Sequence, residues 1–152
     1  MRIIIAIDGT DYGKAALERL CQLGLGNTDE IRVVSVIDMA MPMAIDIYGG
    51  YLPDTSDLEK TAKDNADKYV NEAVAKLGSV FSGDGVRVSS DVLFGTPESR
   101  IVELAEEWKA DLIVVGSHGY RRWERILLGS VSNSIVHHAP CSVMVVRRSD
   151  SD

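Results

Sequence analysis

The sequence predicts a single α/β domain over residues 1–152, in which a five-stranded parallel sheet of order 3-2-1-4-5 carries helices on both faces. Short apolar runs alternate along the chain with segments of helical periodicity, as expected for strand–helix units with right-handed crossovers. The length suits one hydrophobic core. Neither a linker nor an internal repeat divides the sequence, so we expect one domain.

The expected strands are five apolar runs, at residues 2–7, 31–37, 86–94, 112–115 and 142–146. The first, second and fourth are nearly continuous Ile, Val and Leu, which is typical of strands buried on both faces of a parallel sheet. The third run partly alternates between polar and apolar residues, so its strand is expected to be more exposed.

The expected helices cover residues 13–23, 55–81, 96–108 and 130–138, where apolar residues recur at helical spacing. The third begins with Thr96-Pro97-Glu98, which predicts a hydroxyl N-cap, proline at the first helical position and an acid near the positive end of the helix dipole. The fourth ends before Pro140, because a proline disfavours helix in the residue before it.

Composition excludes several classes of protein. The net charge is -7 and the pI about 4.9, which argues against binding to nucleic acid or to a membrane surface. No apolar stretch approaches the ~18 residues that span a bilayer, and no signal peptide is recognisable, so we expect a cytoplasmic protein. Cys21 and Cys141 are far apart and outside any CxxC motif, which predicts two small buried side chains rather than a disulfide or zinc site.

One long connection, residues 38–54, is rich in Met, Tyr and Gly. A connection of this length in a small domain is usually functional or disordered. The sequence leaves open whether it is a flexible lid, a surface that contacts a partner, or a mobile loop in solvent.

The segment most informative about function starts where the fourth strand ends, at the edge of the sheet where ligands of open α/β folds bind. Gly116 and Gly119 allow a ligand to approach the main chain closely, and Gly129-Ser130 open the last helix. The first amides of that helix suit a phosphate, and the hydroxyls of Ser130 and Ser132 could add hydrogen bonds. Glycine spacing alone leaves a second interpretation open, namely two tight turns and an ordinary serine N-cap.

The pattern Gly116-x2-Gly119-x9-Gly129-Ser130 resembles the ATP-binding signature of the universal stress protein family. The resemblance covers nearly the whole chain. It includes these further features: the first strand ending in Asp8, the second ending Val36-Ile37-Asp38, the helix entry Gly95-Thr96-Pro97, and Ala139-Pro140 before the last strand. It implies a Rossmann-like fold of the adenine nucleotide alpha hydrolase-like type and ATP as ligand, with Mg²⁺ or Mn²⁺ left open.

The resemblance also assigns residues to the adenosine end of ATP. Asp8 would contact the adenosine, Val36 would line the adenine pocket, and Val115 and Gly116 would pack against the nucleoside. ATP-binding members often carry proline two positions before the aspartate, where this chain has Ala6; a small apolar alanine should keep that pocket wall.

At the phosphate end, the resemblance places Gly119 under the phosphates and gives the phosphate chain to Gly129, Ser130, Val131 and Ser132. Three arginines lie between the two glycine turns, at positions 121, 122 and 125. They could bring positive charge near a triphosphate or form a solvated helical face, and we favour the second for two of them. His118, inside the loop, is not assigned a catalytic role.

The chain lacks the signatures of common catalysts. A Walker-A lysine, a Ser/His/Asp set and an H-x-E zinc motif are all missing from the sequence. We therefore expect a nucleotide-dependent binding or signalling module with at most slow ATP hydrolysis, and the family resemblance implies a role in stress response.

Two alternatives differ in class. The first is a dimeric interaction module of the same fold that does not bind ATP. The second is a receiver-like phospho-acceptor domain. A receiver domain needs an acceptor Asp after the third strand and a Lys after the fifth, where this chain has Phe94-Gly95 and Arg147-Arg148.

The fifth strand is expected at an edge of the sheet. Its residues are Ser142, Val143, Met144, Val145 and Val146, which lack the charges or proline that block edge pairing. An isologous two-fold contact would cover this edge, and the family resemblance implies the same contact. We expect a homodimer, with further protein partners left unidentified.

Overall fold

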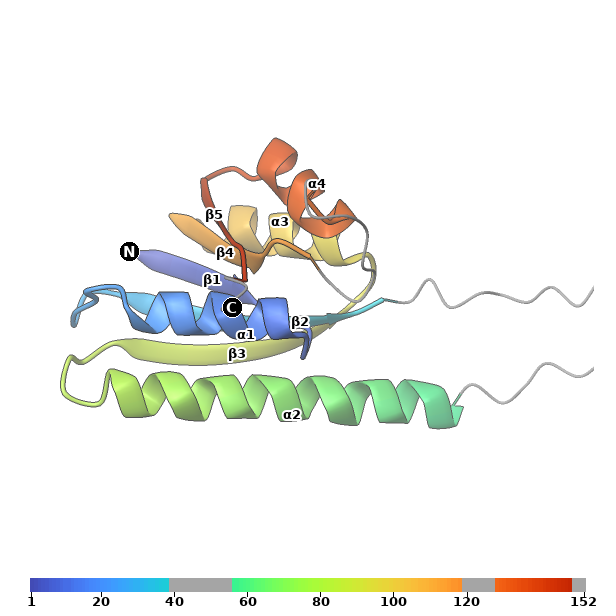
Figure 1. Ribbon diagram of the computed structural model, residues 1–152, viewed down its shortest axis with the longest axis horizontal. Helices are drawn as coiled ribbons and strands as arrows, with labels where there is room; N and C mark the ends of the chain where they lie inside the picture. Colours follow the sequence, from blue (N-terminus) through green and yellow to red (C-terminus); the bar gives the residue numbers. More distant parts are fainter. Residues whose placement is uncertain (39–55, 119–127, 149–152) are drawn as a thin grey trace, which may run out of the picture.

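The structure is a computed structural model that describes residues 1–38, 56–118 and 128–148. Strands and helices alternate as expected along the chain (Figure 1). The elements are β1 (Arg2–Ala6), α1 (Asp11–Cys21), β2 (Glu30–Ile37), α2 (Ser56–Val80), β3 (Arg87–Phe94), α3 (Pro97–Trp108), β4 (Leu112–Gly116), α4 (Ser130–His138) and β5 (Ser142–Val146).

The strands form one parallel sheet of order β3-β2-β1-β4-β5, which confirms the predicted topology. β1 is the central strand, where Ile3 pairs with Ile31 of β2 on one side and with Leu112 of β4 on the other. β3 is partly exposed along its length, as its alternating sequence predicts. β5 lies at the edge, and four of its five residues are partly buried.

Two cores, one on each face of the sheet, hold the layers together. Along β1, Ile3 and Ile5 belong to the core under α1 and α2, whereas Ile4 belongs to the core under α3 and α4. Successive residues of a strand point to opposite faces, so a continuous apolar run supplies both cores. Figure 1 shows α2 along one side of the sheet and α3 and α4 on the other.

One helix start and one helix cap differ from expectation. α1 begins at Asp11, two residues before position 13, because Thr10 is its N-cap and accepts a hydrogen bond from the Gly13 N–H. In α3, Thr96 is the N-cap and Pro97 the first helical residue, as predicted, but the Thr96 hydroxyl makes no capping hydrogen bond. The first turn of α3 is therefore set by the proline rather than by a side-chain cap.

The two cysteines correct another expectation. Both are free thiols, and both are partly rather than fully buried, since Cys21 ends α1 and Cys141 precedes the edge strand β5. Burial raises the pKa of each thiol, and the nearby Asp111 carboxylate adds to the rise at Cys141. Both side chains therefore remain protonated, weakly nucleophilic thiols at neutral pH.

Lys109 ends α3 in a left-handed conformation, with φ 53° and ψ 55°, and its N–H donates to the Ala105 and Glu106 carbonyls. Lys109→Gly should raise the free energy of unfolding by about 0.5 kcal/mol, because glycine avoids the left-handed penalty but loses more chain entropy on folding. Urea denaturation measures the change. Lys109→Ala removes the same side chain without relieving the backbone, so a gain of equal size in that variant would contradict the explanation.

Candidate functional site

A cavity of about 620 Å³ opens at the carboxyl ends of β1, β2 and β4. The starts of α3 and α4 and one face of α2 complete its wall. Nine of the ten residues expected from the sequence line it: Ala6, Asp8, Val36, Val115, Gly116, Gly129, Ser130, Val131 and Ser132. Volumes of this size are typical of small-molecule sites.

Several expectations fall outside the described residues. These are the tenth site residue, Gly119, the arginines at 121, 122 and 125, and the connection beyond Asp38 up to position 54. Asp38 itself is described, is exposed and lines the cavity.

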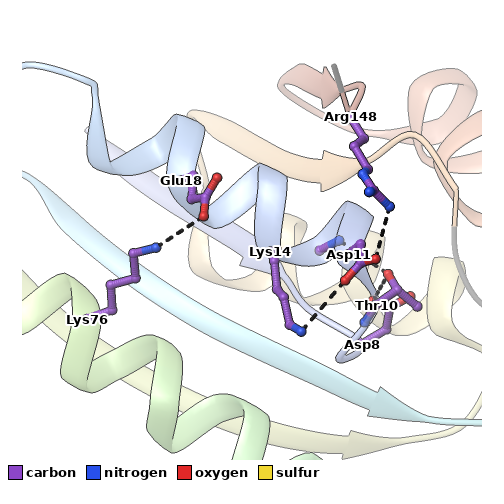
Figure 2. A network of polar contacts seen from close by, with 8 residues as sticks. Asp8, Thr10, Asp11, Lys14, Glu18, Lys76 and Arg148 are labelled. Carbon is purple, nitrogen blue, oxygen red and sulfur yellow. Dashed lines mark hydrogen bonds and ion pairs between the residues drawn. The ribbon is translucent and has the colours of Figure 1, made fainter. Parts of the chain in front are cut away.

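The turn after β1 gives the cavity a fixed carboxylate. Asp8 Oδ1 accepts hydrogen bonds from the Thr10 hydroxyl at 2.6 Å and from the Thr10 N–H at 3.0 Å. Figure 2 shows these two side chains together at the start of α1. The Asp8 side chain is thus held by the N–H and the hydroxyl of Thr10. In the first turn of α1, Asp11 forms an ion pair with Arg148, which follows β5, at 3.0 Å.

The start of α4 forms the opposite part of the cavity wall. Gly129 is the N-cap, and its carbonyl accepts the Asn133 N–H at 2.9 Å. The amides of Ser130, Val131 and Ser132 occupy the first helical positions, which have no intrahelical acceptor. They carry the partial positive charge of the helix dipole, which favours negative charge at this end of the cavity.

The Ser132 hydroxyl has a structural use. Ser132 is 3% exposed, and its Oγ lies 3.0 Å from the carbonyl oxygens of both Ser117 and Gly129. The Gly129 N–H also donates to the Ser117 carbonyl, at 2.8 Å. These bonds join the end of β4 to the start of α4 across the segment between them. The Ser132 hydroxyl proton thus has acceptors inside the protein, and a hydrogen bond from this hydroxyl to a phosphate would have to replace one of these contacts.

Gly116 allows the end of β4 to approach Tyr12 of α1 closely, a contact that the sequence did not predict. A Cβ at this position would lie 2.7 Å from the Tyr12 carbonyl carbon and 2.8 Å from its carbonyl oxygen. The first turn of α1 therefore packs directly on the end of β4. Gly116 lines the cavity as expected, and it also lets β4 and α1 meet.

The described lining of the cavity is acidic in its side chains. Asp8, Asp38 and Glu98 carry carboxylates there, and the described part of the wall contains no lysine or arginine. His118 also lines the cavity, with its Nδ1 3.1 Å from Ser117 Oγ and its ring 5.1 Å from that of Tyr12. In this part of the wall, an anion would therefore interact with the N-terminal ends of helices rather than with lysine or arginine side chains.

Sequence reasoning missed the contribution of α2 and α3. Ala62, Asn65, Ala66 and Tyr69 lie along one face of α2 and line the cavity. Their spacing of three and four residues was a detectable sign of a common face. Nothing local in the sequence indicated that this face would border the end of β1.

Outside the cavity, His137 and His138 are exposed at the end of α4, as surface residues with no ligand spacing would be. The described residues contain no cluster of three or more His, Cys, Asp or Glu that could hold a metal ion. None of the helices in the described ranges is long and apolar enough to cross a bilayer.

A doubly wound parallel sheet with a cavity at its carboxyl edge defines the class as a Rossmann-like α/β domain. The family model described as the universal stress protein family matches residues 1–147. The chain belongs to the universal stress protein family.

Individual relatives agree with this assignment. A protein of Staphylococcus aureus (strain USA300), named as a universal stress protein, is 35% identical over 147 residues, which are 95% of this chain and 82% of the relative. The universal stress protein UspA from Lactobacillus plantarum has a TM-score of 0.75 at 21% identity, covering 97% of both chains. A family member from Arabidopsis thaliana, solved with AMP bound, has a TM-score of 0.70 at 21% identity, covering 99% of this chain and 93% of that one. At these identities the two solved structures establish the fold alone.

Proposed function

We propose that this protein binds an adenine nucleotide, in the first place ATP, in the cavity at the carboxyl edge of the sheet. It would act as a cytoplasmic, nucleotide-dependent module in stress response or signalling. The observation that carries this proposal is the convergence of Asp8, the apolar strand ends and the start of α4 on one cavity of about 620 Å³.

The chemistry of the wall matches the parts of a nucleotide. The apolar side chains of Val36 and Val115 suit the faces of a base, and the Asp8 carboxylate can accept hydrogen bonds from sugar hydroxyls. The amides in the first turn of α4, which have no acceptor within the helix, suit the phosphates. AMP in the Arabidopsis member supports the adenine class of ligand.

Isothermal titration calorimetry with ATP, ADP, AMP, adenosine and GTP tests the proposal. We expect the adenine nucleotides to bind and adenosine to bind at least about tenfold more weakly than ATP, because it lacks contacts with charged phosphates. Titrations with Mg²⁺, with Mn²⁺ and with EDTA reveal whether a divalent cation accompanies the phosphates. Heat changes that are identical with and without protein would contradict nucleotide binding and favour the interaction module.

We further propose that the protein is a homodimer joined along β5, with the contact formed by residues 142–146. The edge position of this strand and its lack of charged residues support the pairing. Sedimentation equilibrium at micromolar concentration should give twice the mass of the chain. A mass of one chain under these conditions would contradict the dimer while leaving the nucleotide site untouched.

A further inference from the structure

Thr10 is linked both to the Asp8 carboxylate and to α1. Its hydroxyl donates to Asp8 Oδ1 at 2.6 Å and accepts the Gly13 N–H at 3.3 Å, while its own N–H donates to the same Oδ1 at 3.0 Å. A hydroxyl has one proton, so donating to the carboxylate while accepting from the helix fixes its orientation. Thr10 thus connects the start of α1 to one oxygen of Asp8 (Figure 2).

Gly13 limits the position of the same oxygen. A Cβ on Gly13 would lie 2.9 Å from Asp8 Oδ1, so the carboxylate rests against the first turn of α1. Gly13 is buried, and both Gly13 and Asp8 line the cavity. The carboxylate is therefore positioned before any ligand arrives, which lowers the entropy cost of using it in binding.

The topology places this carboxylate between the two ends of the cavity. β1 lies between β2, whose end contributes the apolar Val36, and β4, which leads to the start of α4. A nucleotide with its base against the end of β2 and its phosphates on α4 has its sugar over the end of β1. Asp8 stands at that point.

We propose that Thr10 is a positioning residue that orients Asp8 to accept hydrogen bonds from the 2′ and 3′ hydroxyls of ribose, so that the site selects ribonucleotides over dideoxyribonucleotides. The inference rests on the nucleotide site proposed above. It adds a residue that the sequence analysis did not single out, and it assigns the selectivity for the sugar to the Asp8–Thr10 pair.

Titration calorimetry with ATP and with 2′,3′-dideoxy-ATP tests the inference. The measured quantity is the dissociation constant of 2′,3′-dideoxy-ATP divided by that of ATP. In the wild-type protein this ratio should be at least about tenfold, since hydrogen bonds to a charged acceptor are among the stronger ones. Thr10→Val has nearly the same shape without the hydroxyl, and its ratio should fall toward one. Thr10→Ser restores the hydroxyl and should restore the ratio.

Two further variants separate positioning from folding. Thr10→Val also loses the N-cap of α1, whereas Thr10→Gly removes the hydroxyl and leaves an acceptable cap, so it should lose the ratio even if Thr10→Val does not fold. Thr61→Val is the matched control, because the Thr61 hydroxyl is exposed and donates only within α2, to the Asp57 carbonyl at 2.8 Å. Its ratio should equal that of the wild type.

The possible failures are distinguishable. A wild-type protein that binds both nucleotides equally, or Thr10→Val and Thr10→Gly variants that weaken both equally and keep the ratio, would overturn the positioning role and leave the nucleotide site standing. A wild-type protein that binds neither nucleotide would overturn the nucleotide site and the inference together.

Discussion

Replacing Gly129 with aspartate is expected to weaken ATP binding by about 100-fold or more without destabilising the fold. Gly129 is the N-cap of α4, with φ -60° and ψ 157°, a conformation that any residue adopts. Aspartate is a favoured N-cap, so the helix should form at least as well as before. Its carboxylate would stand beside the amides that we assign to the phosphates, and like charges a few ångströms apart cost about 3–4 kcal/mol at the effective dielectric of a protein surface.

The matched control is Gly129→Asn, which has nearly the same size and the same capping ability but no charge. Its loss of ATP affinity should be at least about tenfold smaller than that of Gly129→Asp. Titration calorimetry gives the affinities, and thermal unfolding without nucleotide checks the fold. If both variants lost the same affinity for ATP, the size of the new side chain rather than its charge would explain the loss. If Gly129→Asp bound ATP as well as the wild type, α4 would not be part of the phosphate site.

Gly116→Ala should lower the free energy of unfolding by about 2–4 kcal/mol. The added Cβ would lie 2.7–2.8 Å from three atoms of Tyr12, two of them in the main chain of α1. Because those main-chain atoms belong to a helix packed on the sheet, neither side can yield by a simple rotamer change. Urea or thermal denaturation followed by circular dichroism measures the loss.

Gly78→Ala provides the opposite expectation for the same chemical change. Gly78 lies within α2, and a Cβ there would have nothing within 4 Å. Alanine should stabilise this helix by about 0.5–1 kcal/mol, because glycine loses more chain entropy on folding. If Gly116→Ala did not lower the free energy of unfolding, as Gly78→Ala should not, the explanation by close contact between α1 and β4 would be contradicted.

Most of the fold follows from local patterns. Continuous apolar runs such as residues 31–37 predict strands buried on both faces, and β1 supplies two cores as that pattern requires. The limits of elements are less predictable, since the start of α1 depends on a cap at Thr10 rather than on the apolar stripe. Cysteine burial was overestimated because both cysteines lie at the ends of elements.

The candidate site was predicted partly from the glycine and serine residues that follow the fourth strand and partly, at Asp8 and Val36, from the family resemblance. Residues at the carboxyl ends of parallel strands meet at one edge of the sheet, so Asp8, Val36 and Gly116 line one cavity although they are distant in sequence. The contribution of Tyr69 could not be predicted, because it depends on where α2 packs across the sheet. The engagement of the Ser132 hydroxyl likewise depends on a contact with the end of β4.

The central claim is that the amides at the start of α4 hold the phosphates of a nucleotide whose sugar lies at Asp8. A crystal structure of the protein with bound ATP tests it most directly. We predict phosphate oxygens within hydrogen-bonding distance of the N–H groups of Ser130, Val131 and Ser132, and the ribose hydroxyls on the Asp8 carboxylate. A nucleotide bound elsewhere, or one whose phosphates point away from α4, would contradict the account.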